Sequence, residues 1–335
     1  MEIQLCNKCG FILHTRPGLR QIDGVCLACI NADKKKTINF SERQKWLDMF
    51  LEQNKAQDKY DCLIAVSGGK DSHMIVKRLV DNHNVKNPLL VTVADDYSLS
   101  EAGAHNRKNI SEFFGFDHIV FRNNPKKFRE VSLKDFVERL NPQRWYEETL
   151  YDVPIELARK FNVKTVFFGE NSSFEYGNSE SLEIFHPRST EELNIIFMGS
   201  IYPYSITDSI AVAKEANFKD LADFDTWFRE GSIEDSTQID SIGNMVDIWC
   251  KFPKFGFQRV SDIACRLVRE GILNKEQALR LIREKDHILD RKAKRDFCKV
   301  QNISEDFFDK TVLKHVNRQL IYTDINGYYR RVDCI

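Results

Sequence analysis

The sequence predicts an α/β fold built on a doubly wound parallel sheet, with a small cysteine-rich module before it and a helical region after it. Two observations carry the prediction. Between about residues 60 and 205, short apolar runs alternate with stretches of helix length, and a glycine-rich turn directly follows the first run. Apolar strands without polar alternation are typical of a parallel sheet buried on both faces. Ligands of such sheets bind beyond the carboxyl ends of the strands.

Strands are expected at five apolar runs: Cys62–Val66, Leu89–Val93, His118–Arg122, Thr165–Phe168 and Ile195–Met198. Changes in composition divide the chain into a cysteine module at 1–36, the sheet domain at 37–205 and a helical region at 206–335. We expect the last part to contact substrate or a partner. The lysines at 34–36 are expected to form a solvated linker.

Four runs of helical periodicity begin at residues that cap helices: Ser41, Asp71, Asn274 and Ser304. The helix from Asp71 is expected to reach Val80, and the helix from Asn274 to reach Leu289. The run at 290–296 mixes charges of both signs, so we expect a solvated helix there rather than a binding patch.

The most informative segment is Ser67-Gly68-Gly69-Lys70-Asp71-Ser72, which joins the first predicted strand to a helix. Two adjacent glycines let the backbone turn tightly and bring its N–H groups close to an anion. The helix start adds unpaired N–H donors and the positive end of a dipole. Ser67 and Ser72 offer hydroxyl donors and Lys70 a charge, while Asp71 either caps the helix or faces Mg²⁺. A Walker loop is excluded, because Ile64 and Asp71 stand where that motif needs glycine and Ser or Thr.

Two cysteine pairs mark the N-terminal module. Cys6-x-x-Cys9 and Cys26-x-x-Cys29 are separated by sixteen residues, a spacing expected of a four-cysteine zinc ribbon. Four thiolates in a tetrahedron suit Zn²⁺ and leave no open position for substrate, so the expected role is structural. An iron–sulfur or redox role is the alternative. The other five cysteines form no pair at ligand spacing.

Other polar groups are expected at the same rim of the sheet. The predicted strand Thr165–Phe168 runs into Gly169, Glu170 and Asn171, where Glu170 is a candidate Mg²⁺ ligand or substrate contact and a capping turn is the alternative. Asp95 and Asp96 follow the second strand; they either approach ribose or metal or form a solvated turn. The segment 175–177 either lines the substrate mouth or is an ordinary loop.

Length, composition and charge limit the classes of protein to which the chain can belong. The chain has 335 residues, of which 42% are hydrophobic and 30% charged, with a net charge of −1. No stretch reaches transmembrane length, and the balanced charge gives no sign of a polyanionic partner, so neither membrane nor nucleic acid is expected. The first residues lack a basic segment followed by an apolar one, and paired cysteines suit a reducing compartment. We therefore expect a cytoplasmic protein.

The wording Ser-Gly-Gly-x-Asp-Ser resembles the PP-loop of the ATP pyrophosphatase superfamily. Almost the whole chain resembles the PP-loop N-acetyl sugar amidotransferases, which are associated with pseudaminic acid and lipopolysaccharide sugar biosynthesis. The resemblance rests on the cysteine pairs, on residues 67–72, on the segment from Gly169 to Gly177 and on the segment from Lys254 to Asp262 with the helix pattern that follows. It implies a sheet domain like that of the adenine nucleotide alpha hydrolases.

The resemblance also implies a reaction: an ATP-dependent exchange of the oxygen of a sugar N-acetyl group for ammonia, which gives an acetamidino sugar, AMP and pyrophosphate. The resemblance associates this reaction with the biosynthesis of pseudaminic and legionaminic acid. It implies catalytic roles for Lys70, Asp71 and Glu170. The implied nucleotide-binding residues are Ser67, Gly68, Gly69, Lys70, Asp71, Ser72, Val93, Gly169 and Asn171. ATP, Mg²⁺ and structural Zn²⁺ are the implied cofactors. No glutaminase is evident in the sequence, so separate glutaminase and ammonia-channelling subunits, or free ammonia, are implied.

Two other readings of the motif stay open. Some PP-loop tRNA thiolases also carry an N-terminal zinc module, but they generally need further cysteines near the nucleotide, and no such pair follows Cys62. A tRNA-binding protein would also usually be basic. The second alternative is a non-catalytic subunit that binds an adenine nucleotide and docks partners through its cysteine module.

Overall fold

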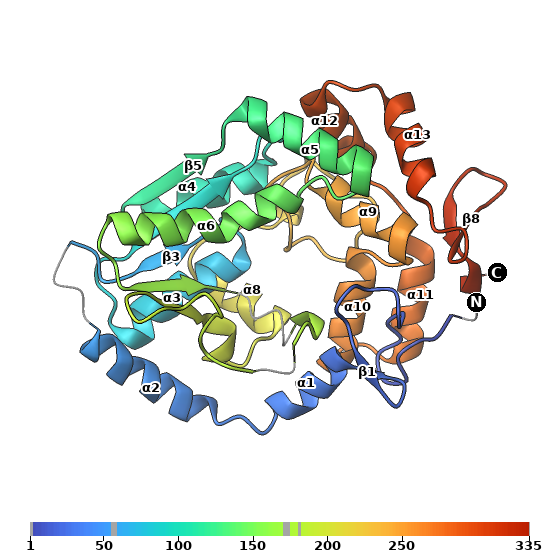
Figure 1. Cartoon of the computed structure of the whole chain (residues 1–335). Helices are drawn as coiled ribbons and strands as arrows, with labels where there is room; N and C mark the ends of the chain where they lie inside the picture. Colours follow the sequence, from blue (N-terminus) through green and yellow to red (C-terminus); the bar gives the residue numbers. More distant parts are fainter. Residues whose placement is uncertain (1–2, 55–58, 170–174, 180–181, 335) are drawn as a thin grey trace.

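The computed structural model describes residues 3–54, 59–169, 175–179 and 182–334. Its centre is a five-stranded parallel sheet in the order β5-β4-β3-β6-β7 (Figure 1). The strands are β3 (Leu63–Ala65), β4 (Leu89–Ala94), β5 (His118–Arg122), β6 (Thr165–Phe168) and β7 (Asn194–Phe197). All five lie within about a residue of the predicted runs, which confirms the predicted doubly wound sheet. The chain order reverses between β3 and β6, and such a switch point is where open parallel sheets bind ligands.

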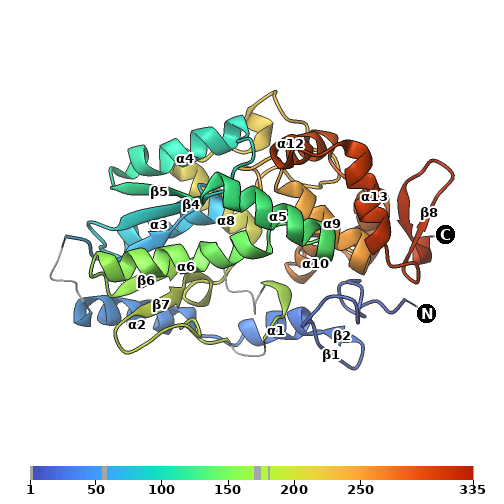
Figure 2. The ribbon, with the colours of Figure 1, turned by 45° about the horizontal axis from the view of Figure 1, so that its top comes forward.

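Helices cover both faces of this sheet (Figure 2). One face packs against α2 (Phe40–Gln53), α3 (Lys70–His83) and α4 (Glu101–Phe114) in a core that includes Leu47, Ile75 and Ile110. The other face packs against α6 (Arg144–Lys160) through Ile155 and Ala158. α5 (Pro125–Arg139) packs beside α6, and α8 (Ile206–Glu215) packs beside α3. Cover on both faces explains why the strands are continuous apolar runs.

Two predicted helix starts are wrong. Asn39, not Ser41, caps α2, because its side chain accepts the Glu42 N–H at 3.2 Å. Gly69, not Asp71, is the N-cap residue of α3, so Asp71 lies inside the first turn of the helix. Helix α3 also extends three residues beyond Val80 to His83.

The cysteine module contains the two-stranded hairpin β1 (Gln21–Ile22) and β2 (Val25–Cys26), followed by α1 (Leu27–Lys35). The predicted solvated linker is wrong at Lys35, the last residue of α1. Its ammonium donates to the backbone carbonyl of Tyr204, and burial lowers the Lys35 pKa to about 8. The module lies against the C-terminal helices (Figure 1) and shares one apolar core with them, including Phe11 and Phe257 at a ring separation of 5.0 Å.

The C-terminal region is mainly helical, as predicted. Its helices are α9 (Met245–Phe255), α10 (Arg259–Arg269), α11 (Lys275–Lys285), α12 (Arg291–Gln301) and α13 (Glu305–His315). Asn274 forms the expected capping box with Gln277, but α11 ends four residues before Leu289. Ser304 caps α13 as predicted. The charged run lies on α12, yet Asp296 is buried and accepts from Ser98.

A hairpin of β8 (Ile321–Thr323) and β9 (Tyr329–Arg331) follows the last α-helix, α13. This hairpin was not predicted from the sequence. Short 3-10 turns occur at Met198–Ser200, Leu221–Asp223 and Val332–Cys334. In the described parts of the chain, no helix is long and apolar enough to cross a membrane. The division at 1–36, 37–205 and 206–335 stays a prediction.

Candidate functional site

A cavity of about 540 Å³ opens at the carboxyl ends of β3, β4 and β6, where the sheet domain, the cysteine module and the C-terminal region meet. Ser67, Val93 and Gly169 mark the three strand ends in its wall. Arg16 reaches it from the cysteine module. The C-terminal region contributes a wall of mainly polar side chains, among them Thr237, Gln238, Asp240, Asn244, Asp247, Lys251, Arg259 and Asp262. The cavity is therefore shared by parts of the chain that are far apart in sequence.

Residues 67–72, which we call the phosphate loop after their predicted role, form a tight turn at this switch point. The Ser67 N–H donates to the Ser72 hydroxyl at 2.9 Å, and the Gly69 N–H donates to the Ser67 hydroxyl at 3.1 Å. Gly68 has a φ of +93°, and a Cβ there would lie 3.1 Å from the backbone nitrogen of Arg107. The turn therefore needs glycine at this position both for its backbone angle and for its closeness to α4.

His73, on α3, contacts the loop through its ring. Its Nδ1 lies 3.1 Å from the Gly69 carbonyl, and its Nε2 lies 3.1 Å from the Asn109 amide nitrogen. These partners fit a neutral ring that donates from Nδ1 and accepts at Nε2. Burial lowers the His73 pKa to about 4, which keeps the ring neutral.

Lys70 and Asp71, two predicted catalytic residues, form a partly buried ion pair, in which only the Lys70 side chain is fully buried. The Lys70 ammonium is 2% exposed and donates to both Asp71 carboxylate oxygens, at 2.7 and 2.8 Å, and to the Tyr204 hydroxyl at 2.9 Å. Burial raises the pKa of Asp71, but the Lys70 charge and hydrogen bond outweigh burial, so the pKa lies below its usual value. Asp71 is therefore ionised, and both side chains are held at the start of α3.

Arginines supply further positive charge around the cavity. Arg259, at the first position of α10, donates to the Tyr176 hydroxyl at 3.0 Å. Arg107 lies beside the phosphate loop on α4. The Nε atoms of both arginines are buried and have no hydrogen-bond partner among the described residues. A bound phosphate would give each of them an acceptor.

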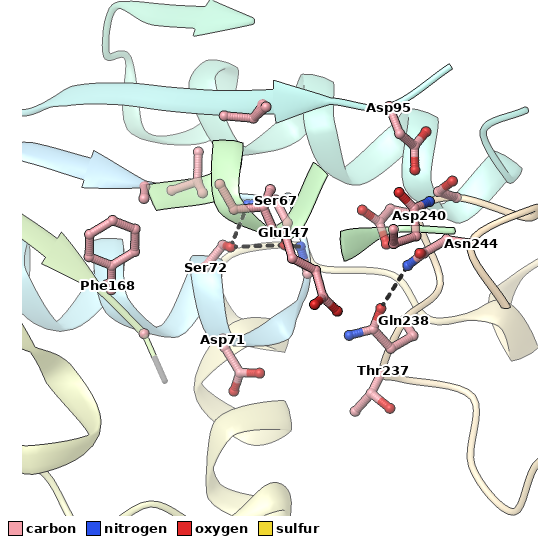
Figure 3. A pocket seen from close by; sticks show the side chains of 18 of the residues that line it. Ser67, Asp71, Ser72, Asp95, Glu147, Phe168, Thr237, Gln238, Asp240 and Asn244 are labelled. Atoms are coloured by element: carbon pink, nitrogen blue, oxygen red, sulfur yellow. Dashed lines mark hydrogen bonds between the residues drawn. The ribbon is translucent and has the colours of Figure 1, made fainter. Parts of the chain in front are cut away.

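Carboxylates also line the cavity. Burial, together with the charge of Asp240, raises the pKa of Asp95 to about 7, against the effect of Arg107 and of hydrogen bonds. Glu147, on α6, extends between the phosphate loop and the segment of Gln238 and Asn244 (Figure 3). Burial, and next the charge of Asp247, raise the Glu147 pKa to about 6, although Lys251 lowers it.

The remaining predicted site residues are placed as follows. Val93 and Gly169 line the cavity, but the Val93 carbonyl already accepts the Tyr146 hydroxyl at 2.7 Å and the Gly169 carbonyl accepts the Gly199 N–H at 3.0 Å. Glu170 and Asn171 lie outside the described residues. Asp95 lines the cavity, whereas Asp96 pairs with Arg122 at 2.6 Å.

The residues of the expected substrate mouth at 175–177 have different surroundings. Tyr176 lines the cavity, and Glu175 is buried and accepts from Arg266 of α10 at 2.6 Å. Sequence reasoning missed the cavity residues from other elements: Arg16, Arg107, Gln143, Glu147, Asp240, Asp247, Lys251, Arg259 and Asp262. None lies in a local motif for phosphate or metal; Arg259 and Asp262 alone fall in a segment that the resemblance had marked.

The four paired cysteines come together as predicted. Their Sγ atoms all lie within 4.8 Å of one another, with Cys6–Cys29 at 3.9 Å and Cys9–Cys26 at 3.8 Å. A tetrahedral Zn²⁺ with bonds of about 2.3 Å holds its sulfurs about 3.8 Å apart. Thiolates that each bind a different iron of a cluster lie further apart, so this arrangement fits one metal ion. It is the one group of three or more metal-ligating side chains found among the described residues.

Comparison with known proteins links the C-terminal region to a family. Residues 224–333 match the family described as LPS biosynthesis protein WbpG-like, C-terminal domain. The chain is also similar to an uncharacterized protein of Methanocaldococcus jannaschii, with 25% identity over 276 residues that cover 81% of this chain and 91% of the relative. A tRNA(Ile)-lysidine synthase of Mesoplasma florum is 25% identical over 122 residues, covering 36% of this chain and 28% of the relative.

Two solved structures share 13% sequence identity with the chain at a TM-score of 0.39. One is an NH3-dependent NAD synthetase from Campylobacter jejuni, covering 83% of this chain and 96% of that chain. The other is the U34-tRNA thiolase NcsA from Methanococcus maripaludis with its [4Fe-4S] cluster, covering 87% and 91%. Likeness at this level carries no argument about the site.

Proposed function

We propose that the protein is an ATP-dependent amidotransferase that converts the N-acetyl group of a sugar into an acetamidino group. One observation carries the proposal. The loop built for phosphate and the region that matches the WbpG-like C-terminal domain line the same cavity, the loop through Ser67 and Gly69 and the region through Asp247 and Arg259. The family's description as LPS biosynthesis supports a sugar as the acceptor.

The phosphate loop would hold the β- and γ-phosphates of ATP. Its glycine turn leaves room for the anion, the first N–H groups of α3 lack intrahelical partners, and the unpartnered Nε atoms of Arg107 and Arg259 lie in the same cavity region. The carbonyl oxygen of the N-acetyl group then attacks the α-phosphorus, and pyrophosphate leaves with the electron pair of the broken bond. This makes the amide oxygen a good leaving group, which ammonia replaces at carbon.

Magnesium and zinc belong to the proposal in different ways. Mg²⁺ would neutralise the charge of the leaving pyrophosphate. Asp71, within the loop, is a carboxylate that could help to hold it, because Mg²⁺ often needs only one or two protein ligands besides phosphates. Cys6, Cys9, Cys26 and Cys29 would hold a structural Zn²⁺. A separate glutaminase with a channelling subunit, or free ammonia, would supply the nitrogen.

The tRNA thiolase alternative has less support. In the described part of the chain, no cysteine side chain lines the cavity, so no thiol is placed there to carry sulfur. Cys62, Cys250, Cys265 and Cys298 are all buried.

The nucleotide products test the proposal most simply. Purified protein with Mg-ATP, ammonium chloride and N-acetylated sugars should form AMP and pyrophosphate in a sugar-dependent way. Ser67→Ala and Asp71→Ala should abolish AMP formation while the far-ultraviolet circular dichroism stays unchanged. Release of ADP and phosphate instead, or near-normal turnover in both variants, would contradict the assigned site.

A further inference from the structure

One end of the cavity holds a cluster of three side chains that no predicted role explains. Gln143 precedes α6, Glu147 lies one turn further along the same helix, and Asp247 faces them from α9. The Asp247 carboxylate accepts the backbone N–H of Gln143 at 3.2 Å, which joins the two elements. Lys251, one turn along α9 from Asp247, also lines the cavity.

The polar atoms of this cluster are available to a ligand. The Gln143 side chain is 1% exposed, and neither its Oε1 nor its Nε2 has a hydrogen-bond partner among the described residues. A buried amide without partners is destabilising, so it marks a place where a ligand can supply the missing bonds. The Glu147 carboxylate extends into the cavity (Figure 3).

Charge indicates what kind of ligand fits. Two carboxylates and one ammonium give this cluster a net negative charge. ATP phosphates would be repelled there. A small cation that donates several hydrogen bonds would satisfy Gln143 Oε1 and both carboxylates at once.

We propose that Gln143, Glu147 and Asp247 bind an ammonium ion, and that Glu147 removes its proton so that ammonia is released next to the activated acceptor. This inference rests on the proposed amidotransferase function and assigns its nitrogen site.

The step balances in atoms and electrons. Ammonium gives one proton to a carboxylate oxygen of Glu147 and becomes ammonia. The nitrogen lone pair forms the C–N bond to the adenylated N-acetyl carbon, and the C–O bond breaks as AMP leaves with its electron pair. The adenylated amide and ammonia together carry one proton more than the product, and water takes that proton, so the product is an amidinium cation. Its planar N–H groups can pair with Asp247 in the way a guanidinium pairs with a carboxylate. Glu147 returns its proton to water at the cavity mouth.

The electrostatics of Glu147 suit a base at neutral pH. The cavity walls desolvate the Glu147 carboxylate although the residue stays exposed to solvent. Together with the charge of Asp247 they raise its pKa to about 6, against the effect of Lys251. Asp247 and Lys251 are the charged groups that face it from α9. A general base is most effective when its pKa lies near the working pH, because it is then mostly ionised yet still basic.

The test compares Glu147→Gln with Glu148→Gln. Glu148, the next residue, is exposed like Glu147, but it pairs with Arg144 at 3.2 Å and does not line the cavity. Steady-state rates of AMP formation are measured against ammonium chloride from pH 5 to 9. ATP–pyrophosphate exchange with the N-acetyl sugar and no ammonium reports the adenylation step separately. Hydroxylamine, which is largely unprotonated at neutral pH, serves as a nucleophile that needs no base.

We expect Glu147→Gln to lower kcat/KM for ammonium by about 100-fold or more, with exchange within about threefold of the unmodified protein. The rise of kcat/KM near pH 6 should disappear, and hydroxylamine should restore most of the rate. Glu148→Gln should behave as the unmodified protein. The inference is overturned if Glu147→Gln keeps the ammonium dependence and the pH limb, or loses ammonium and hydroxylamine reactions equally. Absence of sugar-dependent exchange in the unmodified protein would instead overturn the proposed function, and this inference with it.

Discussion

The guanidinium of Arg16, in the cysteine module, lies 2.6 Å from the carboxylate of Asp262 on the first turn of α10, and a second N–H···O contact spans 3.3 Å. Both side chains line the cavity. The Arg16 guanidinium also lies over the Tyr176 ring at 4.8 Å. The cysteine module therefore places a charged side chain at the cavity wall, although its four clustered sulfurs do not line the cavity themselves.

Breaking this pair should destabilise the protein. Arg16→Ala leaves the Asp262 carboxylate buried without its partner, and we expect a loss of about 3 kcal/mol in the free energy of unfolding, measured by urea denaturation. Arg16→Ala with Asp262→Asn should recover part of that loss, because no unpaired charge remains. Lys8→Ala removes an exposed ion pair with Asp33 in the same module and should change little. Equal losses in the free energy of unfolding for Arg16→Ala and Lys8→Ala would show that the buried pair stabilises the protein no more than the exposed pair does.

The cysteine cluster should hold one metal ion per chain. Cys26→Ser removes one of four ligands, so we expect the metal content, measured by inductively coupled plasma mass spectrometry, to fall toward zero and the melting temperature to drop. Cys298→Ser alters a buried thiol outside the cluster and should keep the metal. Full stability and activity of the metal-free variant would rule out a structural metal.

Acid should weaken the fold through His73. The folded-state pKa of about 4 lies below the ordinary value of 6.5, so the unfolded chain binds the proton more tightly. This contribution to stability is complete above pH 6.5 and is lost as the pH falls toward 4, with a full size of about 3 kcal/mol. His73→Gln should flatten this part of the stability-versus-pH curve. His14→Asn, at an exposed position, should leave the curve unchanged; an identical slope in both variants would assign the effect elsewhere.

Gly68 should tolerate no side chain. Gly68→Ala places a Cβ 3.1 Å from the Arg107 backbone at a φ of +93°, so we expect the loop to shift and ATP affinity, measured by isothermal titration calorimetry, to fall at least tenfold. Gly271→Ala is the matched control, since its φ is +76° but no atom lies within 4 Å of the new Cβ. It should cost about 1–2 kcal/mol of stability and leave ATP affinity intact. Unchanged affinity in Gly68→Ala would mean that the loop does not hold the nucleotide.

The sheet and its phosphate loop could be predicted because their signals are local. β4 is apolar at nearly every position since both faces are covered, and residues 67–72 are adjacent in sequence. The polar and charged side chains that other elements bring to the cavity could not be predicted. Gln143, Asp247 and Arg259 come from separate elements and meet only through packing. The same holds for Lys35, whose burial depends on the distant residue Tyr204.

The predicted helix starts were wrong where two nearby residues could each serve as the N-cap. Asn39 and Ser41 both favour an N-cap position, and the fold uses the earlier one. Asp71 resembled a cap by residue type, but its carboxylate pairs with Lys70 and leaves the cap to the backbone of Gly69. The hairpin at the end of the chain is short and polar, so it lacked the periodicity that marks a strand.

The central claim is tested most directly by mass spectrometry of the acceptor. Purified protein is incubated with Mg-ATP, ammonium chloride and a panel of N-acetylated nonulosonic acids and nucleotide sugars. The account predicts that one class of sugar gains the mass change of oxygen replaced by NH, with AMP and pyrophosphate formed in equal amounts. Conversion of no sugar, together with AMP formation only when tRNA and a sulfur donor are supplied, would contradict it and establish a thiolase instead.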